Sequence, residues 1–172
     1  MKIIDNFLDE DSFEVLQQYF LSDTISWHLG NSITYDKQGI DQYQFVHTFF
    51  DVGKPYLNNW SNFLQPVLTK LNAQYIFRIK ANLRPRTSQG VLSPFHTDMN
   101  LNQPTAILYL NTNNGYTKFK DQSLKDVKSV ANRLVTFYGA LEHCGCSCTD
   151  DNARIVLNIN YIPAIGSSYL NP

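Results

Sequence analysis

The chain has 172 residues, a formal net charge of −1 and a hydrophobic fraction of 43%. This length and composition predict one globular domain over residues 1–172, large enough to bury a substantial core. No stretch concentrates positive charge, so we do not expect a nucleic-acid-binding surface. No apolar run is long enough to cross a bilayer, and the N-terminal residues lack the apolar region of a signal peptide. We therefore expect a cytoplasmic protein without a membrane partner.

The first part of the chain, residues 1–74, is expected to support the rest of the domain. A short strand is predicted at Lys2–Leu8, and a helix begins after it with Asp9 or Asp11 as its N-cap. Apolar residues recur at helical spacing within Phe13–Phe20, which predicts one face that packs against the core.

Residues 22–44 show no regular period and contain turn formers, which predicts loops and short strands beside the core. A second helical segment is predicted at Pro55–Leu71, where apolar residues recur every three or four positions. Pro66 lies inside it and predicts a kink or a pair of helices. His28 and His47 have no second ligand at a suitable spacing, so we expect them to be structural.

The second half of the chain changes to short alternating strands. Tyr75–Arg84 alternates and is rich in β-formers, and strands follow at Ala106–Asn111, Leu134–Tyr138 and Arg154–Tyr161. Many short strands with few helices predict a mainly β fold with flanking helices. We expect a double-stranded β-helix, or jelly roll, over about residues 75–163.

Three residues in this half have the side chains of a metal site. His96 and Asp98 stand two positions apart, and in an extended segment such residues point to the same side. His143 follows the predicted strand Leu134–Tyr138 and supplies a third ligand. Two histidines and one carboxylate with open positions are the ligand set of non-haem Fe(II) oxygenases. The sequence therefore predicts a metal site of these three residues.

Arg154 opens the next apolar strand, a short distance after His143. A guanidinium is always charged, so inside a barrel it requires an anion, and a dicarboxylate would provide one. A surface position is the alternative, although the apolar neighbours of Arg154 favour the interior.

In this order, His-X-Asp, a distal histidine and an arginine on the following strand resemble the Fe(II)/2-oxoglutarate dioxygenases. Within them the chain most resembles the prolyl 4-hydroxylase-like group. Ala106–Asn111 resembles the strand after His-X-Asp, and Asn132–Phe137 resembles the strand that leads to the distal histidine. Gly115–Phe119 resembles the group's Gly-Gly-x-Thr-x-Phe segment, with Tyr116 in place of the second glycine. The resemblance covers roughly half of the chain, from about Tyr75 to Tyr161.

This resemblance implies an enzyme that uses Fe(II), 2-oxoglutarate and O2 to hydroxylate an unactivated C–H bond, with decarboxylation of 2-oxoglutarate to succinate and CO2. The substrate that it suggests is a prolyl residue in a peptide or protein, or a small molecule. Arg154, helped by the Tyr109 hydroxyl, would bind the far carboxylate of 2-oxoglutarate. No catalytic side chain is implied beyond the metal ligands. The candidates for pocket lining are Asn82, Thr136, Asn158 and Asn160.

Two other classes of function stay open. One is a cupin-like metal enzyme that uses no oxo acid, and the other is a jelly-roll binding module without catalysis. Arg154 and Tyr109 favour the oxygenase over the cupin-like enzyme, and the complete ligand set favours it over the binding module. Taken alone, His96 and Asp98 also fit a turn or N-cap pair, and Tyr109 also fits a core position.

The cysteines form a separate cluster, Cys144, Cys146 and Cys148. An odd number in one short stretch argues against a disulfide framework and for a reducing compartment. A zinc site is conceivable, but alternating thiols without a second pair make a poor tetrahedral set. We therefore favour buried or edge thiols without a catalytic role.

Overall fold

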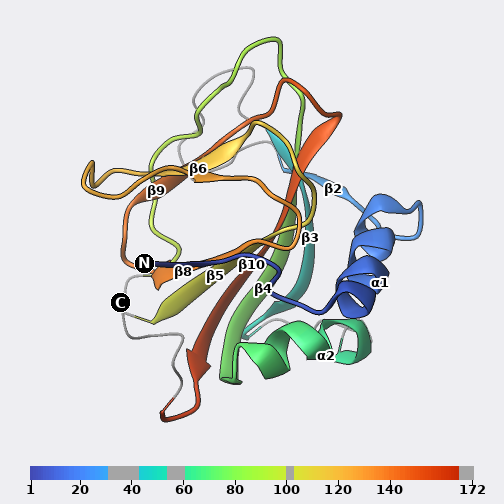
Figure 1. The fold of residues 1–172 in the computed structure, drawn as a ribbon, viewed down its shortest axis with the longest axis vertical. Helices are drawn as coiled ribbons and strands as arrows, with labels where there is room; N and C mark the ends of the chain where they lie inside the picture. The colour runs from blue at the N-terminus through green and yellow to red at the C-terminus, as the bar shows by residue number, and fades with distance from the viewer. Residues whose placement is uncertain (31–42, 54–60, 100–102, 167–172) are drawn as a thin grey trace.

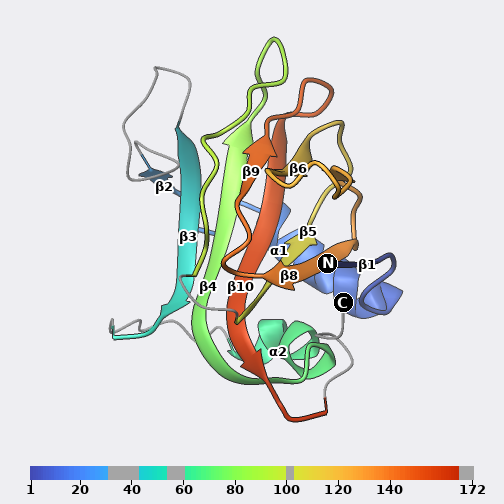
Figure 2. The ribbon, with the colours of Figure 1, turned by 90° about the vertical axis from the view of Figure 1, so that its left-hand side faces the viewer.

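The computed structural model describes residues 1–30, 43–53, 61–99 and 103–166. Two antiparallel sheets lie face to face, and the helices cover the other face of the larger sheet (Figure 1; Figure 2). The seven strands of the larger sheet are, in spatial order, β1 (Lys2–Ile4), β8 (Leu134–Tyr138), β5 (Pro104–Tyr109), β10 (Ala153–Pro163), β4 (Ala73–Pro85), β3 (Gln44–Asp51) and β2 (His28–Gly30). The smaller sheet consists of β7 (Val127–Lys128), β6 (Tyr116–Phe119) and β9 (His143–Cys146). The predicted mainly β jelly roll with flanking helices is confirmed.

Helix α1 (Glu10–Leu21) begins where the sequence predicts it. The side chain of Asp9, the N-cap, accepts a hydrogen bond from the Ser12 backbone N–H at 2.9 Å. Acidic residues in the first turn suit the positive end of the helix dipole. The buried side chains Phe13, Leu16 and Phe20 then lie on one face and pack against the larger sheet.

Helix α2 (Ser61–Lys70) forms the C-terminal part of the second predicted helical segment. Residues 54–60 of that segment lie outside the described residues. Pro66 lies within this one helix rather than between two. Leu64, Val67 and Leu68 are buried and share a core with α1. In the described ranges, neither helix is long and apolar enough to span a membrane.

Strand β10 is buried on both faces, and its sequence alternates to match. Ile155, Leu157 and Ile159 pack in the core beneath the helices. Successive side chains of a strand point to opposite faces, so Arg154, Val156, Asn158 and Asn160 face the smaller sheet. The neighbouring strand β4 has the same arrangement, with Ile79 and Ala81 in the helix-side core and Lys80, Asn82 and Arg84 on the other face. The space between the two sheets thus has a polar wall.

An apolar cluster fills the rest of that space. It contains Ile107, Tyr109, Phe119, Val127, Val135, Phe137 and Val156, contributed by both sheets. Ile107 and Val156 of this cluster lie beside the polar side chains on the same pocket wall.

The N-terminal part of the chain contributes more than support. Strand β1 pairs with β8, and β3 pairs with β4, so both are members of the larger sheet. The sequence analysis did not predict β3, although Gln44–Asp51 contains a run of aromatic and β-branched residues. Residues 31–42, part of the stretch interpreted as irregular, lie outside the described residues.

Asn132 joins the N-terminal segment to the barrel. Its backbone has a positive φ of 62°, its side-chain oxygen accepts from the Leu8 N–H at 2.8 Å, and its side-chain amide donates to the Leu8 carbonyl at 2.9 Å. We expect Asn132→Ala to lower the free energy of unfolding by about 2–4 kcal/mol, because two buried backbone groups lose partners and alanine disfavours this φ. Urea unfolding followed by circular dichroism measures the change.

Asn72 provides a matched control for this prediction. It also has a positive φ, 52°, but its side chain is exposed and makes no hydrogen bond with the described residues. Asn72→Ala should therefore lose about 1 kcal/mol, the backbone contribution alone. Equal losses in the two variants would show that the Leu8 hydrogen bonds contribute nothing.

Candidate metal centre

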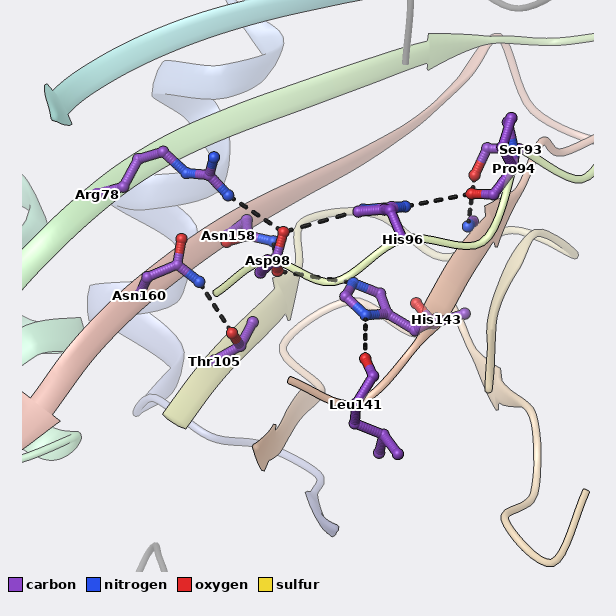
Figure 3. Close-up of polar contacts among 12 residues, drawn as sticks. Arg78, Ser93, Pro94, His96, Asp98, Thr105, Leu141, His143, Asn158 and Asn160 are labelled. Atoms are coloured by element: carbon purple, nitrogen blue, oxygen red, sulfur yellow. Dashed lines mark hydrogen bonds and ion pairs between the residues drawn. The ribbon is translucent and has the colours of Figure 1, made fainter. Parts of the chain in front are cut away.

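His96, Asp98 and His143 come together in front of the polar wall (Figure 3). His96 Nε2 lies 3.9 Å from Asp98 Oδ1, and His143 Nε2 lies 3.6 Å from Asp98 Oδ2. One ligand atom from each of the three residues lies within 4.8 Å of the others. The sequence prediction placed these side chains in one site, and the structure brings them together.

The segment that carries His96 and Asp98 is extended but is not a strand. His96 forms an isolated β-bridge with His143, with N–H to carbonyl distances of 3.0 Å and 2.9 Å in the two directions. The Asp98 N–H instead donates to the carbonyl of Gly139 at 3.0 Å. Pairing with β9 on one side and with the turn at Gly139 on the other directs both side chains toward His143.

The orientation of both imidazoles is fixed by backbone carbonyls. Nδ1 of His96 lies 3.2 Å from the Pro94 oxygen, and Nδ1 of His143 lies 3.0 Å from the Leu141 oxygen. A carbonyl only accepts hydrogen bonds, so each Nδ1 carries a proton, and a neutral ring in this orientation presents its Nε2 lone pair toward Asp98. Burial, with His143 adding to it, lowers the pKa of His96 and favours this neutral form.

The side chain of Asp98 is only 5% exposed and is held by two donors. Arg78 Nη2 lies 3.1 Å from Oδ1, and the Asn158 side-chain amide donates to Oδ2 at 2.7 Å. Burial alone would raise the pKa of Asp98, but its electrostatic interactions with His143 and Arg78 and the Asn158 hydrogen bond together lower it. The carboxylate is therefore ionised and fixed in one orientation. The sequence analysis did not foresee that Arg78 pairs with Asp98.

These residues fit a divalent ion. Two imidazole nitrogens and a carboxylate face one another, and this ligand set can enclose a cation. Ligand atoms about 2.1 Å from a shared ion lie at most about 4.2 Å apart, and both distances to Asp98 are below this limit. Mixed imidazole and carboxylate ligands suit Fe(II).

A polar pocket extends from the three ligands between the sheets. Positive charge dominates its wall, because Lys80, Arg84 and Arg154 line it, whereas Asp98 is the only carboxylate on it among the described residues. Burial, reinforced by Arg78, lowers the pKa of Lys80 to about 8. The pocket therefore suits an anionic ligand.

Arg154 is buried among neutral hydrogen-bond partners. It is 6% exposed, its Nε donates to Ser129 Oγ at 2.9 Å, and its Nη2 donates to Thr117 Oγ1 at 2.9 Å. Burial lowers the pKa of Arg154, since no carboxylate among the described residues pairs with it. Gly115 leaves the room for this side chain: an added Cβ would lie 2.8 Å from Arg154 Cδ. A buried guanidinium with only neutral partners is stabilised when an anion binds beside it.

Tyr109 lies beneath Arg154 rather than on the pocket wall. The guanidinium carbon is 5.4 Å from the centre of the Tyr109 ring. The hydroxyl of Tyr109 donates to Thr117 Oγ1 at 2.7 Å and approaches the Val127 carbonyl at 3.3 Å. Tyr109 thus acts on the pocket by positioning Arg154 and Thr117.

The other pocket candidates divide into two groups. Asn82 and Asn158 lie on the pocket wall. Asn160 faces the same space but is fully buried and donates to Thr105 Oγ1 at 2.9 Å, away from the wall. Thr136 alternates with Val135 of the inner cluster, so it points to the helix side.

The histidines predicted to be structural lie outside the metal group. Nδ1 of His47 contacts the Ser26 carbonyl at 2.8 Å, and the His28 ring stacks 6.4 Å from the His47 ring.

The three cysteines are free and buried, and Cys144 reaches the pocket wall. Burial raises the pKa of Cys144 to about 11, so its thiol stays protonated and is a poor metal ligand at neutral pH. We expect the triple Cys→Ser variant to keep stoichiometric Fe(II) binding, measured by metal analysis after desalting. A triple Cys→Ala variant controls for the hydroxyl groups. Loss of iron from both variants would instead support a thiolate site.

Comparison with known proteins gives a likeness of fold. No protein-family model and no curated protein matches the sequence. A prolyl hydroxylase from Trichoplax adhaerens, solved with a peptide of the hypoxia inducible factor oxygen degradation domain, is 12% identical with a TM-score of 0.62, over 99% of this chain and 87% of that one. A Pseudomonas putida prolyl-4-hydroxylase is 15% identical with a TM-score of 0.55, over 94% and 91%. The non-haem alpha-ketoglutarate-dependent epimerase SnoN of nogalamycin biosynthesis is 12% identical with a TM-score of 0.66, over 94% and 77%. The chain therefore has the fold of the Fe(II)/2-oxoglutarate oxygenases.

Proposed function

We propose that the chain is an Fe(II)- and 2-oxoglutarate-dependent oxygenase that hydroxylates an unactivated C–H bond. One oxygen atom of O2 enters succinate as 2-oxoglutarate loses CO2, and the other enters the hydroxyl group of the product. One observation carries this proposal: the His96/Asp98/His143 group shares one pocket with a buried arginine, Arg154, that has no anionic partner within the described ranges. An ion site alone would equally suit a cupin-like enzyme that uses no oxo acid.

The residues of the pocket have distinct roles in this proposal. When bound, Fe(II) supplies the redox chemistry that activates O2. His96, Asp98 and His143 would hold the ion, and three protein ligands would leave positions for the co-substrate and O2. Arg154 binds the far carboxylate of 2-oxoglutarate and thereby sets the direction of its chain. Arg78 and Asn158 keep the Asp98 carboxylate in place through their hydrogen bonds.

For the substrate we propose a prolyl residue in a peptide or protein. Two of the structures with the same fold are prolyl hydroxylases, and one of them was solved with a peptide. We also propose that residues 1–172 act as a single domain, since strands from both halves of the chain form the larger sheet. The free, buried thiols suit a reducing compartment, and we propose the cytoplasm.

The test is the addition of Fe(II) and then 2-oxoglutarate under anaerobic conditions. The proposal expects a weak visible charge-transfer band that requires both components, followed by succinate formation when O2 is admitted. Fe(II) binding without the band and without succinate would favour the cupin-like enzyme. A prolyl-containing peptide should increase succinate formation and gain one oxygen atom by mass spectrometry, whereas its alanine-substituted counterpart should not.

A further inference from the structure

A second buried arginine lies beside Arg154. Arg84 on β4 is the direct cross-strand partner of Arg154 on β10, and both side chains line the pocket. Directly opposed residues on one face of an antiparallel pair have Cβ atoms about 4.5–5.5 Å apart. The two guanidinium groups therefore start from adjacent positions on the same wall.

Both guanidinium groups reach the same residue of the smaller sheet. Arg84 Nη1 donates to the Gly145 carbonyl at 2.8 Å. A Cβ added to Gly145 would lie 3.2 Å from Arg154 Nη1, so this group lies just beneath the same glycine. The arginines thus converge across the pocket from β4 and β10 onto β9.

This convergence leaves uncompensated positive charge and an unused donor. Arg84 is 5% exposed, and its Nη2 is buried without a hydrogen-bond partner in the described part of the chain. Among the described residues neither arginine pairs with a carboxylate. Asp98, the carboxylate on the pocket wall, is bound by Arg78 and Asn158 instead. Burial, and then the charge of Arg154, lower the pKa of Arg84, as expected for like charges brought together. Directly opposed like charges are destabilising, so a pair of this kind requires an anion between its members.

We propose that Arg84 and Arg154 form a two-arginine clamp on the far carboxylate of the co-substrate. The clamp makes the pocket select a 2-oxo dicarboxylate over a 2-oxo monocarboxylate of the same length. This inference rests on the proposed function, because it assigns a second cation to the co-substrate of that reaction. Arg154 is fixed by Ser129 and Thr117, and Arg84 by Gly145, so the clamp is ordered before the ligand arrives.

The test compares binding of two oxo acids that differ only at the far end. 2-Oxoglutarate and 2-oxovalerate share five carbons and the metal-facing oxo acid group, but 2-oxovalerate lacks the far carboxylate. Dissociation constants are measured by calorimetry on the anaerobic Fe(II)-loaded protein, so turnover is not the readout. We expect Arg84→Gln to weaken 2-oxoglutarate binding at least tenfold and to leave 2-oxovalerate binding within twofold.

Two further variants make the outcome decisive. Arg86→Gln is the matched control, since Arg86 is exposed just beyond the end of β4 and should change neither constant. Arg84→Lys keeps the charge but not the fork, and should weaken 2-oxoglutarate binding at least threefold if Arg84→Gln does not fold. Binding of 2-oxoglutarate within twofold of the wild type in the folded Arg84 variants would overturn the clamp. Failure of the wild-type protein to bind either oxo acid would instead overturn the proposed function, and the clamp with it.

Discussion

Alanine at Asp98 or at His96 is expected to abolish stoichiometric Fe(II) binding. Each substitution removes one of three ligands, and the two that remain cannot enclose the ion on one face. Substituting a residue that only hydrogen-bonds to a metal ligand typically lowers metal affinity about 10–100-fold. Removing a ligand itself should therefore lower Fe(II) affinity by more than about 100-fold. Anaerobic equilibrium dialysis followed by metal analysis measures the effect.

The two variants differ in their structural consequences, which makes them a useful pair. Asp98→Ala removes the acceptor of the buried Asn158 amide and the ion-pair partner of the partly exposed Arg78, so it also lowers stability. The His96 side chain is 30% exposed and its ring makes one backbone contact, so His96→Ala isolates the loss of a ligand. Asp126→Ala, at an exposed carboxylate paired loosely with Lys118, should bind iron normally. Full occupancy in both site variants would refute the metal centre.

Arg154→Ala is expected to raise the apparent KM for 2-oxoglutarate steeply while Fe(II) affinity changes little. An unpaired carboxylate in a partly dry pocket costs about 2–5 kcal/mol, and each 1.4 kcal/mol is about tenfold in affinity, so the increase should be roughly 30-fold or more. The side-chain hydrogen bonds of Arg154 go to Ser129 and Thr117 and not to the metal ligands, so its loss should leave the ion site intact. Succinate formation at varied 2-oxoglutarate concentration provides the measurement.

Tyr109→Phe tests whether Tyr109 acts through Arg154. Its hydroxyl donates to Thr117, which also accepts from Arg154, so the substitution loosens the arginine without removing it. The increase in KM should be smaller than in Arg154→Ala, at most about 1.5–3 kcal/mol when expressed as free energy. An unchanged co-substrate affinity in Arg154→Ala would move the assignment toward the cupin-like enzyme.

The features predicted correctly from the sequence are those set by local order along the chain. The N-cap at Asp9 and the helical spacing after it define α1. Alternation in β10 identifies which residues share a face with Arg154. The grouping of His96, Asp98 and His143 was predicted because their side-chain types and their order are unusual together, even though the His96 segment is not a strand.

The features that the sequence did not reveal depend on pairing across the sheet. Arg78 and Asp98 are far apart in the chain, so their ion pair follows only from the position of the His96 segment over β4. For β4, alternation shows that Lys80 and Arg84 share a face, but not whether that face meets solvent or the smaller sheet. Thr136 was a pocket candidate for the same reason: its face is decided by where α1 and α2 pack.

The alternation of β10 has a consequence for insertions and deletions. Site residues and core residues share this strand at successive positions, so one inserted or deleted residue exchanges their faces. Arg154, Asn158 and Asn160 would then meet the helices, and Ile155, Leu157 and Ile159 would enter the pocket. A shift of one residue along this strand therefore cannot remove the site residues from the pocket without also removing the apolar residues from the core. Natural variation in the length of the chain is therefore expected in the turns around β10 and not within it.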